Sequence, residues 1–499
     1  MDVSLRPTRA EFLQLRKRGN VIPIYADVLA DGNTPVTAFR RLDDGGLSFL
    51  FESAEQTERT GRYSFLGFQP RVVMRSEGRT FTCEENGVRR GEAITQDALV
   101  HLEKMMSRFR FVDDPALPRF AGGAVGYLGY ETIASFEPTV PRAPTDNLRV
   151  PEMIFMIMNL LIVFDHRERR MKLIVNAFVE KAEEAENVYA TAKLLIESTL
   201  ARLSSPFELR QIDAQRETTP RTMESNFSRE RFESAVTKAK EHIVAGDIFQ
   251  VVVSQRFQTD FRGDPLDLYR CLRLVNPSPY MFCLRLGDFS LVGSSPELHV
   301  RLADEVVEVR PIAGTRRRGL TSEADAKNAA ELLADPKERA EHIMLVDLAR
   351  NDLGRIAQFG SVRVTEQMIV ERYSHVMHLV SHVKAKLAAG KNAYDVMRAT
   401  FPAGTVSGAP KIRAMQIIRE LEGETRGCYA GAVGYFGFDG ALDCCIALRS
   451  AVLKDGRVYV QAGAGIVADS IPSAEYQETI SKATAILQAI ARADDPDHR

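Results

Sequence analysis

The stretch GAVGYLGYE at residues 123–131 returns almost unchanged as GAVGYFGFD at residues 431–439. A glycine-rich phosphate loop would need the complete spacing of a dinucleotide fingerprint followed by a helix, and neither copy has it. Valine, tyrosine and phenylalanine favour strands, and a glycine within a strand marks a place where other groups approach the backbone closely. We therefore predict two equivalent strands, one in each of two similar sheets.

Regular structure is predicted on both sides of these strands. Met153–Phe164 and Met171–Phe178 have the pattern of a strand pair, and an amphipathic helix follows over Lys181–Leu203. The other predicted elements are strands at Ile248–Phe257, Met281–Leu286, Glu297–Leu302, Val306–Val309, Tyr429–Phe438, Asp443–Leu453 and Val458–Gln461, and helices at Ser228–Gly246, Ser322–Ala334, Pro336–Arg350 and Pro472–Ala491.

The chain has 499 residues, which is more than one ordinary hydrophobic core accommodates. Residues 206–226 are polar and lack hydrophobic periodicity, as is typical of a linker. We therefore expect an N-terminal domain over residues 1–205 and a second domain over residues 227–499.

Composition excludes several classes of protein. Hydrophobic residues make up 45% of the chain and the formal net charge is −2, without a block of like charge, which argues against binding to nucleic acid or to a membrane surface. The N-terminus lacks the apolar core of a secretory signal. The most apolar stretch, Met153–Phe164, is far shorter than the roughly 20 residues of a membrane-spanning helix. The six scattered cysteines show no metal-binding spacing, so we expect a reduced, cytoplasmic protein.

Two predicted helices carry paired carboxylates. Asp335 is placed to cap a helix that carries Glu338 and Glu341, and the last helix carries Glu475 and Glu478 at the same spacing. This spacing puts both members of a pair on one helix face. Together the two pairs could hold a hard cation such as Mg²⁺ through carboxylate oxygens and waters. Alternatively, Glu338 completes a capping box and the acidic faces are simply solvated.

Three histidines, His375, His378 and His382, would align on one helix face and suggest zinc. The segment Tyr373–Val383, however, alternates and is rich in valine, which predicts a strand. A strand puts His378 and His382 on one face and His375 on the other, so the zinc site is rejected. A single histidine that acts as acid or base remains possible.

Two short segments are suited to a small anionic ligand. Ile312–Thr315 precedes three arginines, and Gln461–Gly465 offers unobstructed backbone amides, so we predict that both are binding loops. Arg449 falls within a predicted strand, Ile446–Val452, where a charge needs a partner. That partner is either a structural salt bridge or the carboxylate of a ligand, and the spacing does not separate the two.

Together these motifs resemble those of the chorismate-utilising enzymes, and specifically of anthranilate synthase component I. The motifs between about residues 227 and 490 are NPSPYM at 276–281, SPEL at 295–298, PIAGT at 311–315, EHIMLVDLARND at 341–352, FPAGTVSGAPK at 401–411 and QAGAGIV at 461–467. The resemblance over about residues 22–178 is looser. It implies an α+β fold of two domains, in which large, mostly antiparallel sheets pack as a sandwich with helices on the outside.

The resemblance also implies roles for individual residues. Mg²⁺ would bind Glu341 and Glu478, assisted by Glu338 and Glu475, and would hold the ring carboxylate of chorismate. Glu297 would act as the general acid that protonates the departing C4 hydroxyl while ammonia adds at C2, which requires a raised pKa. His378 would assist the elimination of pyruvate. The residues expected to contact the substrate are Gly314, Thr315, Tyr429, Arg449, Gly463, Ala464, Gly465 and Lys482.

Two positions discriminate within the family. Relatives that add water carry a lysine base where this chain has Gln250, and ammonia needs no such base. Relatives that make aminodeoxychorismate typically carry a nucleophilic lysine where this chain has Ala313. The resemblance therefore implies direct amination at C2, the first committed step of tryptophan biosynthesis. Aminodeoxychorismate synthase component I and a non-catalytic, tryptophan-sensing homologue are the alternatives.

Regulation and a partner are implied as well. Ser53, Pro279, Tyr280 and Met281 match the family's tryptophan pocket, although the prolines could merely shape a turn. The chain contains no Gly-x-Cys-x-Gly motif of an amidotransferase, so ammonia from glutamine would come from a separate component II in a heterotetramer. We expect free ammonia to suffice for the chain alone.

Overall fold

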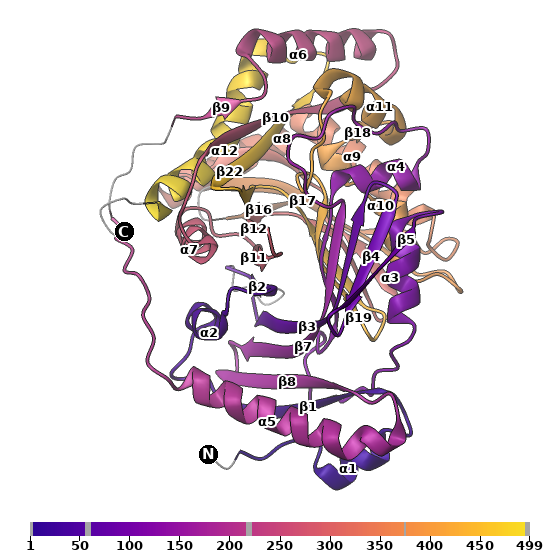
Figure 1. Cartoon of the computed structure of the whole chain (residues 1–499). Coiled ribbons are helices and arrows are strands. Elements are labelled where there is room, and N and C mark those ends of the chain that lie inside the picture. The colour runs from indigo at the N-terminus through magenta and orange to yellow at the C-terminus, as the bar shows by residue number, and fades with distance from the viewer. Residues whose placement is uncertain (1–2, 55–60, 216–221, 374–375, 495–499) are drawn as a thin grey trace.

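The structure, a computed structural model, describes residues 3–54, 61–215, 222–373 and 376–494 (Figure 1). Every pairing between its named strands is antiparallel. Two long strands that are distant in sequence, β3 (Tyr63–Glu77) and β7 (Met153–Asp165), form a central antiparallel pair. Their register changes between Pro70 and Val72, beside a left-handed Gln69, and such an irregularity bends a strand. The pair therefore belongs to two walls of sheet.

The first wall continues from β7 through β6 (Gly123–Leu128), β19 (Ala432–Gly437), β20 (Leu442–Ile446), β13 (Leu298–Ala303) and β14 (Val306–Val309) to β17 (Val376–Lys386), which also pairs with β15 (Ile312–Arg317) and β16 (Arg363–Arg372). The second continues from β3 through β2 (Ser48–Glu52), β11 (Tyr280–Arg285), β12 (Phe289–Ser295) and β21 (Ser450–Lys454) to β22 (Arg457–Ile466) and β10 (Gln250–Asp260). β8 (Arg170–Phe178) and β1 (Val21–Leu29) extend the second wall beyond β7, and β4 (Thr80–Glu85) and β5 (Val88–Ala93) extend the first beyond β3.

The two walls enclose an inner core without helices. Tyr127, Met156 and Tyr435 come from the first wall, and Phe282 and Leu291 from the second, and all are buried in one cluster. Each large apolar side chain buried in this way contributes about 1.5–3 kcal/mol. The predicted sandwich of antiparallel sheets is therefore confirmed.

Helices cover the outer faces, as predicted, and bury two further apolar clusters. They are α1 (Arg9–Leu15), α2 (Pro35–Leu42), α3 (Ala98–Met106), α4 (Ile133–Phe136), α5 (Ala185–Leu203), α6 (Arg229–Val244), α7 (Pro265–Val275), α8 (Ser322–Ala334), α9 (Pro336–Gly354), α10 (Ala393–Thr400), α11 (Lys411–Glu422) and α12 (Pro472–Ala493). In Figure 1, α5 lies along β8 and β1, while α6 and α12 lie near β10 and β22. Ser228 caps α6, as predicted, by accepting from the backbone N–H of Arg231.

The two copies of the repeated stretch form β6 and β19. The prediction that they belong to separate sheets is wrong, because they pair with each other and Gly126 lies opposite Gly434. The prediction that other groups approach the backbone closely at their glycines is confirmed. A Cβ on Gly126 would lie 1.8 Å from the carbonyl oxygen of Ile154, and one on Gly434 would lie 2.0 Å from that of Asp443.

Three local predictions need correction. Ile312–Thr315 and Gln461–Gly465 were expected to be loops, but they lie in β15 and β22, because their backbones pair with β17 and β10. Arg449 was expected inside a strand. It instead occupies the break between β20 and β21 with a φ of 46°, a conformation that interrupts a ladder.

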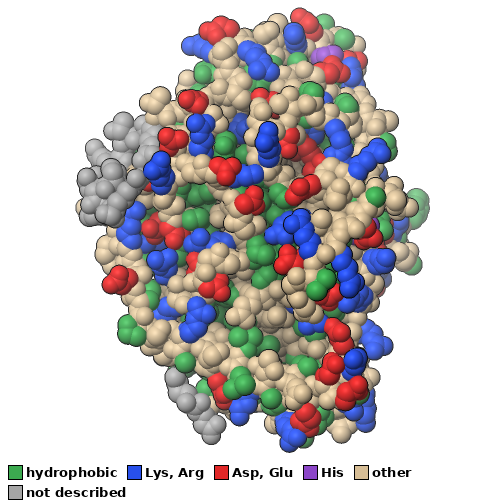
Figure 2. All heavy atoms as spheres, in the orientation of Figure 1, with side chains coloured by type: hydrophobic (Ala, Val, Ile, Leu, Met, Phe, Trp, Pro, Cys, Tyr) green, Lys and Arg blue, Asp and Glu red, His purple; other side chains and the backbone are tan. Residues whose placement is uncertain are grey.

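Both walls contain strands from residues 1–205 and from residues 227–499. The division into two domains and a linker therefore stays a prediction. No helix of the described residues is long and apolar enough to cross a membrane. Figure 2 shows acidic and basic side chains interspersed over the visible face, in keeping with the small net charge.

Candidate active site

Glu297 lies between β12 and β13 and is almost completely buried. Burial raises the pKa of its carboxyl to about 8, because neighbouring hydrogen-bond donors and the charge of Arg449 offset only part of the cost of desolvation. The carboxyl is therefore mostly protonated at neutral pH. It can donate a proton, as a general acid must.

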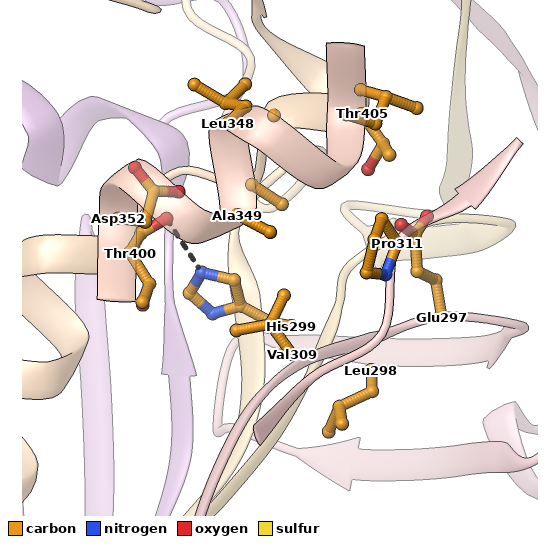
Figure 3. Close-up of a pocket in the computed structure, with 13 residues that line it drawn as sticks. Glu297, Leu298, His299, Val309, Pro311, Leu348, Ala349, Asp352, Thr400 and Thr405 are labelled. Atoms are coloured by element: carbon orange, nitrogen blue, oxygen red, sulfur yellow. Dashed lines mark hydrogen bonds between the residues drawn. The ribbon is translucent and has the colours of Figure 1, made fainter. Parts of the chain in front are cut away.

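A small, mainly apolar pocket borders Glu297 (Figure 3). Leu345, Leu348 and Pro311 line it, and at its other side the ring of His299 contacts the carbonyl of Thr400. These apolar walls contribute to the burial of the Glu297 carboxyl, and burial raises its pKa.

His378 of β17 is held against the bulge in β15. Its Nδ1 lies 3.0 Å from the carbonyl oxygen of Gly314 and 3.0 Å from the hydroxyl of Thr315. Burial lowers the pKa of the ring to about 4, so the imidazole is neutral at neutral pH. Because a carbonyl can only accept, the contact with Gly314 places the proton on Nδ1 and leaves Nε2 as a base.

Arg449 faces the same region, since its charge acts on both Glu297 and His378. Burial lowers the pKa of its guanidinium, and the charge of Glu297 opposes that effect. No residue in the described ranges forms a hydrogen bond or ion pair with this guanidinium. Between the two alternatives for Arg449, this favours a clamp for a ligand carboxylate over a structural salt bridge.

The carboxylates of α9 and α12 approach one another. Burial raises the pKa of Glu341, and the charges of Glu338 and Glu478 add to the rise. Burial and Glu478 likewise raise the pKa of Glu475. Two of the four carboxylates have cationic partners: Glu338 pairs with Arg316 at 2.9 Å and Glu478 with Lys482 at 2.7 Å.

The donor set is suited to Mg²⁺, which prefers oxygen ligands and needs only one or two carboxylates besides substrate and waters. Among the described residues, no three acidic, histidine or cysteine side chains form a ready-made metal cage. The mutual repulsion on Glu341 is the observation that supports a cation, because a divalent charge would relieve it. Asp335 caps α9 as predicted, but Glu338 turns to Arg316 rather than completing a capping box.

The glycines of β22 make room for the remaining side chains. Lys482 donates to the carbonyl of Gly463 at 3.0 Å, and a Cβ on Gly463 would lie 2.8 Å from the Tyr429 hydroxyl. A Cβ on Gly465 would lie 2.7 Å from Nε2 of Gln250. Ala464 lies between the two glycines, and its side chain is buried in the outer core.

The structure thus brings the predicted acid, base, metal-binding and substrate-binding residues to one region. Sequence reasoning missed two neighbours, Arg316 and Tyr373. The Tyr373 ring meets the His378 ring edge-on at 5.4 Å. The run of arginines and the histidine-rich strand were the available signals for them. The prediction for His375 lies outside the described residues.

The proposed inhibitor residues lie elsewhere, where β2 meets β11. Met281 pairs with Glu52, and the backbone N–H of Ala54 donates to the carbonyl of Ser278 at 3.0 Å. Ser53 and Pro279 are therefore close neighbours. The Tyr280 hydroxyl accepts from Arg301 at 3.0 Å.

Comparison with known proteins identifies the family of the chain. Residues 48–488 match the family model described as chorismate binding enzyme. The chain belongs to this family of chorismate-binding enzymes. Within it, the chain is 47% identical to anthranilate synthase component 1 of Pseudomonas putida, over 97% of this chain and 99% of that protein.

Solved structures of two enzymes share the fold of this chain. The crystal structure of anthranilate synthase component I from Streptococcus pneumoniae superposes with a TM-score of 0.74 and 38% identity, over 92% of this chain and 98% of that one. The menaquinone-specific isochorismate synthase of Escherichia coli gives a TM-score of 0.71 with 19% identity, over 96% and 99% of the two chains, and shows a shared fold.

Proposed function

We propose that this chain converts chorismate and ammonia to anthranilate and pyruvate, as a lyase. The observation that carries the proposal is the buried Glu297 carboxyl, with its pKa of about 8, beside an Arg449 guanidinium that forms no hydrogen bond or ion pair with a described residue. An acid next to a free carboxylate clamp is what amination of a dicarboxylate with a poor leaving group requires.

In the first step, Glu297 donates its proton to the C4 hydroxyl, which leaves as water while the ammonia nitrogen bonds to C2 and the ring double bonds shift. Arg449 holds a substrate carboxylate, and the backbone at Gly463–Gly465 with Lys482 and Tyr429 confines the ring. Gly314 and Thr315 contact His378, and Gly314 also lies close to the side chain of Glu338. With the substrate held by these groups, positioning and electrostatics carry much of the rate.

In the second step, Nε2 of the neutral His378 accepts the C2 proton, the ether bond at C3 breaks, and enolpyruvate leaves as the ring becomes aromatic; protonation of its methylene carbon then gives pyruvate. Glu341 and Glu478, with Glu338 and Glu475 assisting, would hold Mg²⁺, which would neutralise the substrate carboxylate and fix its orientation. Gln250 and Ala313 provide neither a base for water nor a nucleophile for the ring. Ammonia is therefore the nucleophile at C2.

The proposal extends to regulation and assembly. Tryptophan would bind at Ser53 and Pro279–Met281 and inhibit the first committed step of its own synthesis. A separate glutaminase subunit would supply ammonia from glutamine. The resemblance to anthranilate synthase component I supports both statements, and the word component in that name implies a second subunit.

The test is product analysis with purified chain, chorismate, Mg²⁺ and ammonium. We expect fluorescent anthranilate with the mass of the aminated aromatic acid, and a lower rate when tryptophan is added. Aminodeoxychorismate as the product would favour the folate-type alternative. Tryptophan binding without any turnover of chorismate would favour a sensing protein.

A further inference from the structure

A single buried serine joins the proposed inhibitor loop to the proposed carboxylate clamp. The hydroxyl of Ser294 donates to the carbonyl of Asn276 and accepts from the Asn276 side-chain amide at 3.1 Å. The backbone N–H of Ser294 donates to the carbonyl of Arg449 at 3.1 Å. Asn276 directly precedes Pro277–Met281. Ser294 therefore contacts the start of this loop through its hydroxyl and Arg449 through its backbone.

The strand around Ser294 strengthens this connection. Tyr280 of β11 pairs with Ser295 of β12, so the inhibitor loop and the end of β12 are neighbours along their backbones. The general acid Glu297 is two residues further along the chain. A displacement of the loop therefore reaches both catalytic groups through one short segment.

Arg449 is a residue that needs such support. Its φ of 46° lies in the left-handed region, which non-glycine residues adopt only where surrounding contacts hold them. The hydrogen bond from Ser294 is one of those contacts, and no described residue holds the guanidinium at the other end. The orientation of the side chain therefore depends on how its backbone is held.

We propose that Ser294 is a positioning residue that sets the substrate-facing orientation of Arg449 and transmits the state of the 276–281 loop to it. The inference rests on the proposed function, in which tryptophan binds at this loop. Tryptophan would displace Asn276, weaken its hydrogen bonds to Ser294, and so loosen the hold on Arg449. The effect falls on the affinity for chorismate, and by linkage chorismate weakens tryptophan binding by the same factor.

The test compares Ser294→Ala with the wild-type chain, using Ser290→Ala, a buried serine on the same strand, as the control. The KM for chorismate is measured without tryptophan and at saturating tryptophan. Tryptophan binding is read from the ligand's own indole fluorescence, because the chain contains no tryptophan.

In the wild type and in Ser290→Ala, we expect saturating tryptophan to raise the KM at least about fivefold. In Ser294→Ala, which loses both hydrogen bonds of the hydroxyl with Asn276, we expect the KM without tryptophan to rise about three- to tenfold while kcat changes less than about twofold. The ratio of the two KM values should fall toward one although tryptophan still binds. Binding with the wild-type ratio would overturn the proposal.

Two further measurements keep the outcome decisive. If Ser294→Ala does not fold, Asn276→Ala removes the amide from the other side, and it should also bring the KM ratio toward one. A wild-type chain that binds no tryptophan would overturn the proposed regulation and the transmission of it. An unchanged KM without tryptophan in both variants would overturn the positioning role.

Discussion

The side-chain amide of Gln250 donates a hydrogen bond of 2.9 Å to the carboxylate of Glu341. Burial raises the pKa of Glu341, and this hydrogen bond opposes the rise by stabilising the charged form. Where water-adding relatives are expected to carry a lysine base, this chain carries an amide that favours the charged form of a carboxylate in the proposed metal site. Under the proposed function, the position would serve the cation rather than the nucleophile.

Replacing Gln250 should weaken Mg²⁺ binding before it affects chemistry. Without the amide, the pKa of Glu341 rises further and protons compete better with the metal. Loss of a group that orients a metal ligand typically costs about 10–100-fold in metal affinity. We expect Gln250→Ala to raise the Mg²⁺ concentration for half-maximal activity by that factor, with kcat at saturating Mg²⁺ within a few-fold of wild type. Gln258→Ala, further along β10, is the control and should leave the Mg²⁺ titration unchanged.

The pH profile should be bell-shaped. Glu297 must be protonated to act as an acid, so kcat/KM should fall as pH rises through about 8, the raised pKa of its carboxyl. His378 must be neutral to act as a base, so kcat/KM should also fall as pH drops through about 4, the lowered pKa of its imidazole. Measurement of kcat/KM against pH at saturating Mg²⁺ tests both limbs.

Variants of Glu297 and His378 test which residue causes each limb of the pH profile. Glu297→Gln keeps the shape of the side chain but cannot donate the proton, so we expect a loss of about 10²–10⁴-fold in kcat and no limb near pH 8 in the residual activity. His378→Gln should remove the limb near pH 4. A limb that persists in the variant of its own residue would contradict the assignment.

Most residues of the candidate site could be predicted from the sequence because they belong to short motifs. Glu297, His378 and the two carboxylate pairs stand in such motifs, and their residue types suggest an acid, a base and metal ligands. Sequence reasoning failed where pairing partners decide the conformation. Nothing near Gly314 or Gly463 in the sequence shows that β17 and β10 turn these glycine-rich segments into strands. The left-handed backbone of Arg449 is likewise imposed by contacts with distant residues, among them Ser294.

Ala313 offers a test of direct amination. It is buried on β15 opposite Leu379, two residues before Thr315, which contacts His378. A lysine there would place an amine beside the substrate ring. We expect Ala313→Lys to form a covalent adduct with chorismate, visible in the mass of the intact chain, and to lose anthranilate output. Ala313→Met matches the length without the amine and should form no adduct. Clean anthranilate production by the lysine variant, with no adduct, would show that the residue at position 313 does not decide which nucleophile attacks the ring.

The close contacts of Gly126 and Gly434 predict unusual sensitivity to a single methyl group. A Cβ on Gly126 would lie 1.8 Å from the carbonyl oxygen of Ile154 in β7, and one on Gly434 would lie 2.0 Å from that of Asp443 in β20, so β6 must move away from β7, or β19 from β20, to admit it. Since β6 and β19 pair with each other and join the N-terminal and C-terminal parts of the first wall, either separation would disturb packing there. We expect Gly126→Ala and Gly434→Ala each to lower the free energy of unfolding by about 3 kcal/mol.

Chemical denaturation with matched controls measures that loss. Gly32→Ala is the reference, because a Cβ there meets nothing within 4 Å, and its effect should stay within about 0.5 kcal/mol. The double variant Gly126→Ala/Gly434→Ala should lose close to the sum of the two single losses, because one methyl group separates β6 from β7 and the other separates β19 from β20. A loss well below the sum would mean that the paired strands β6 and β19 move as a unit and that the first displacement makes room for the second.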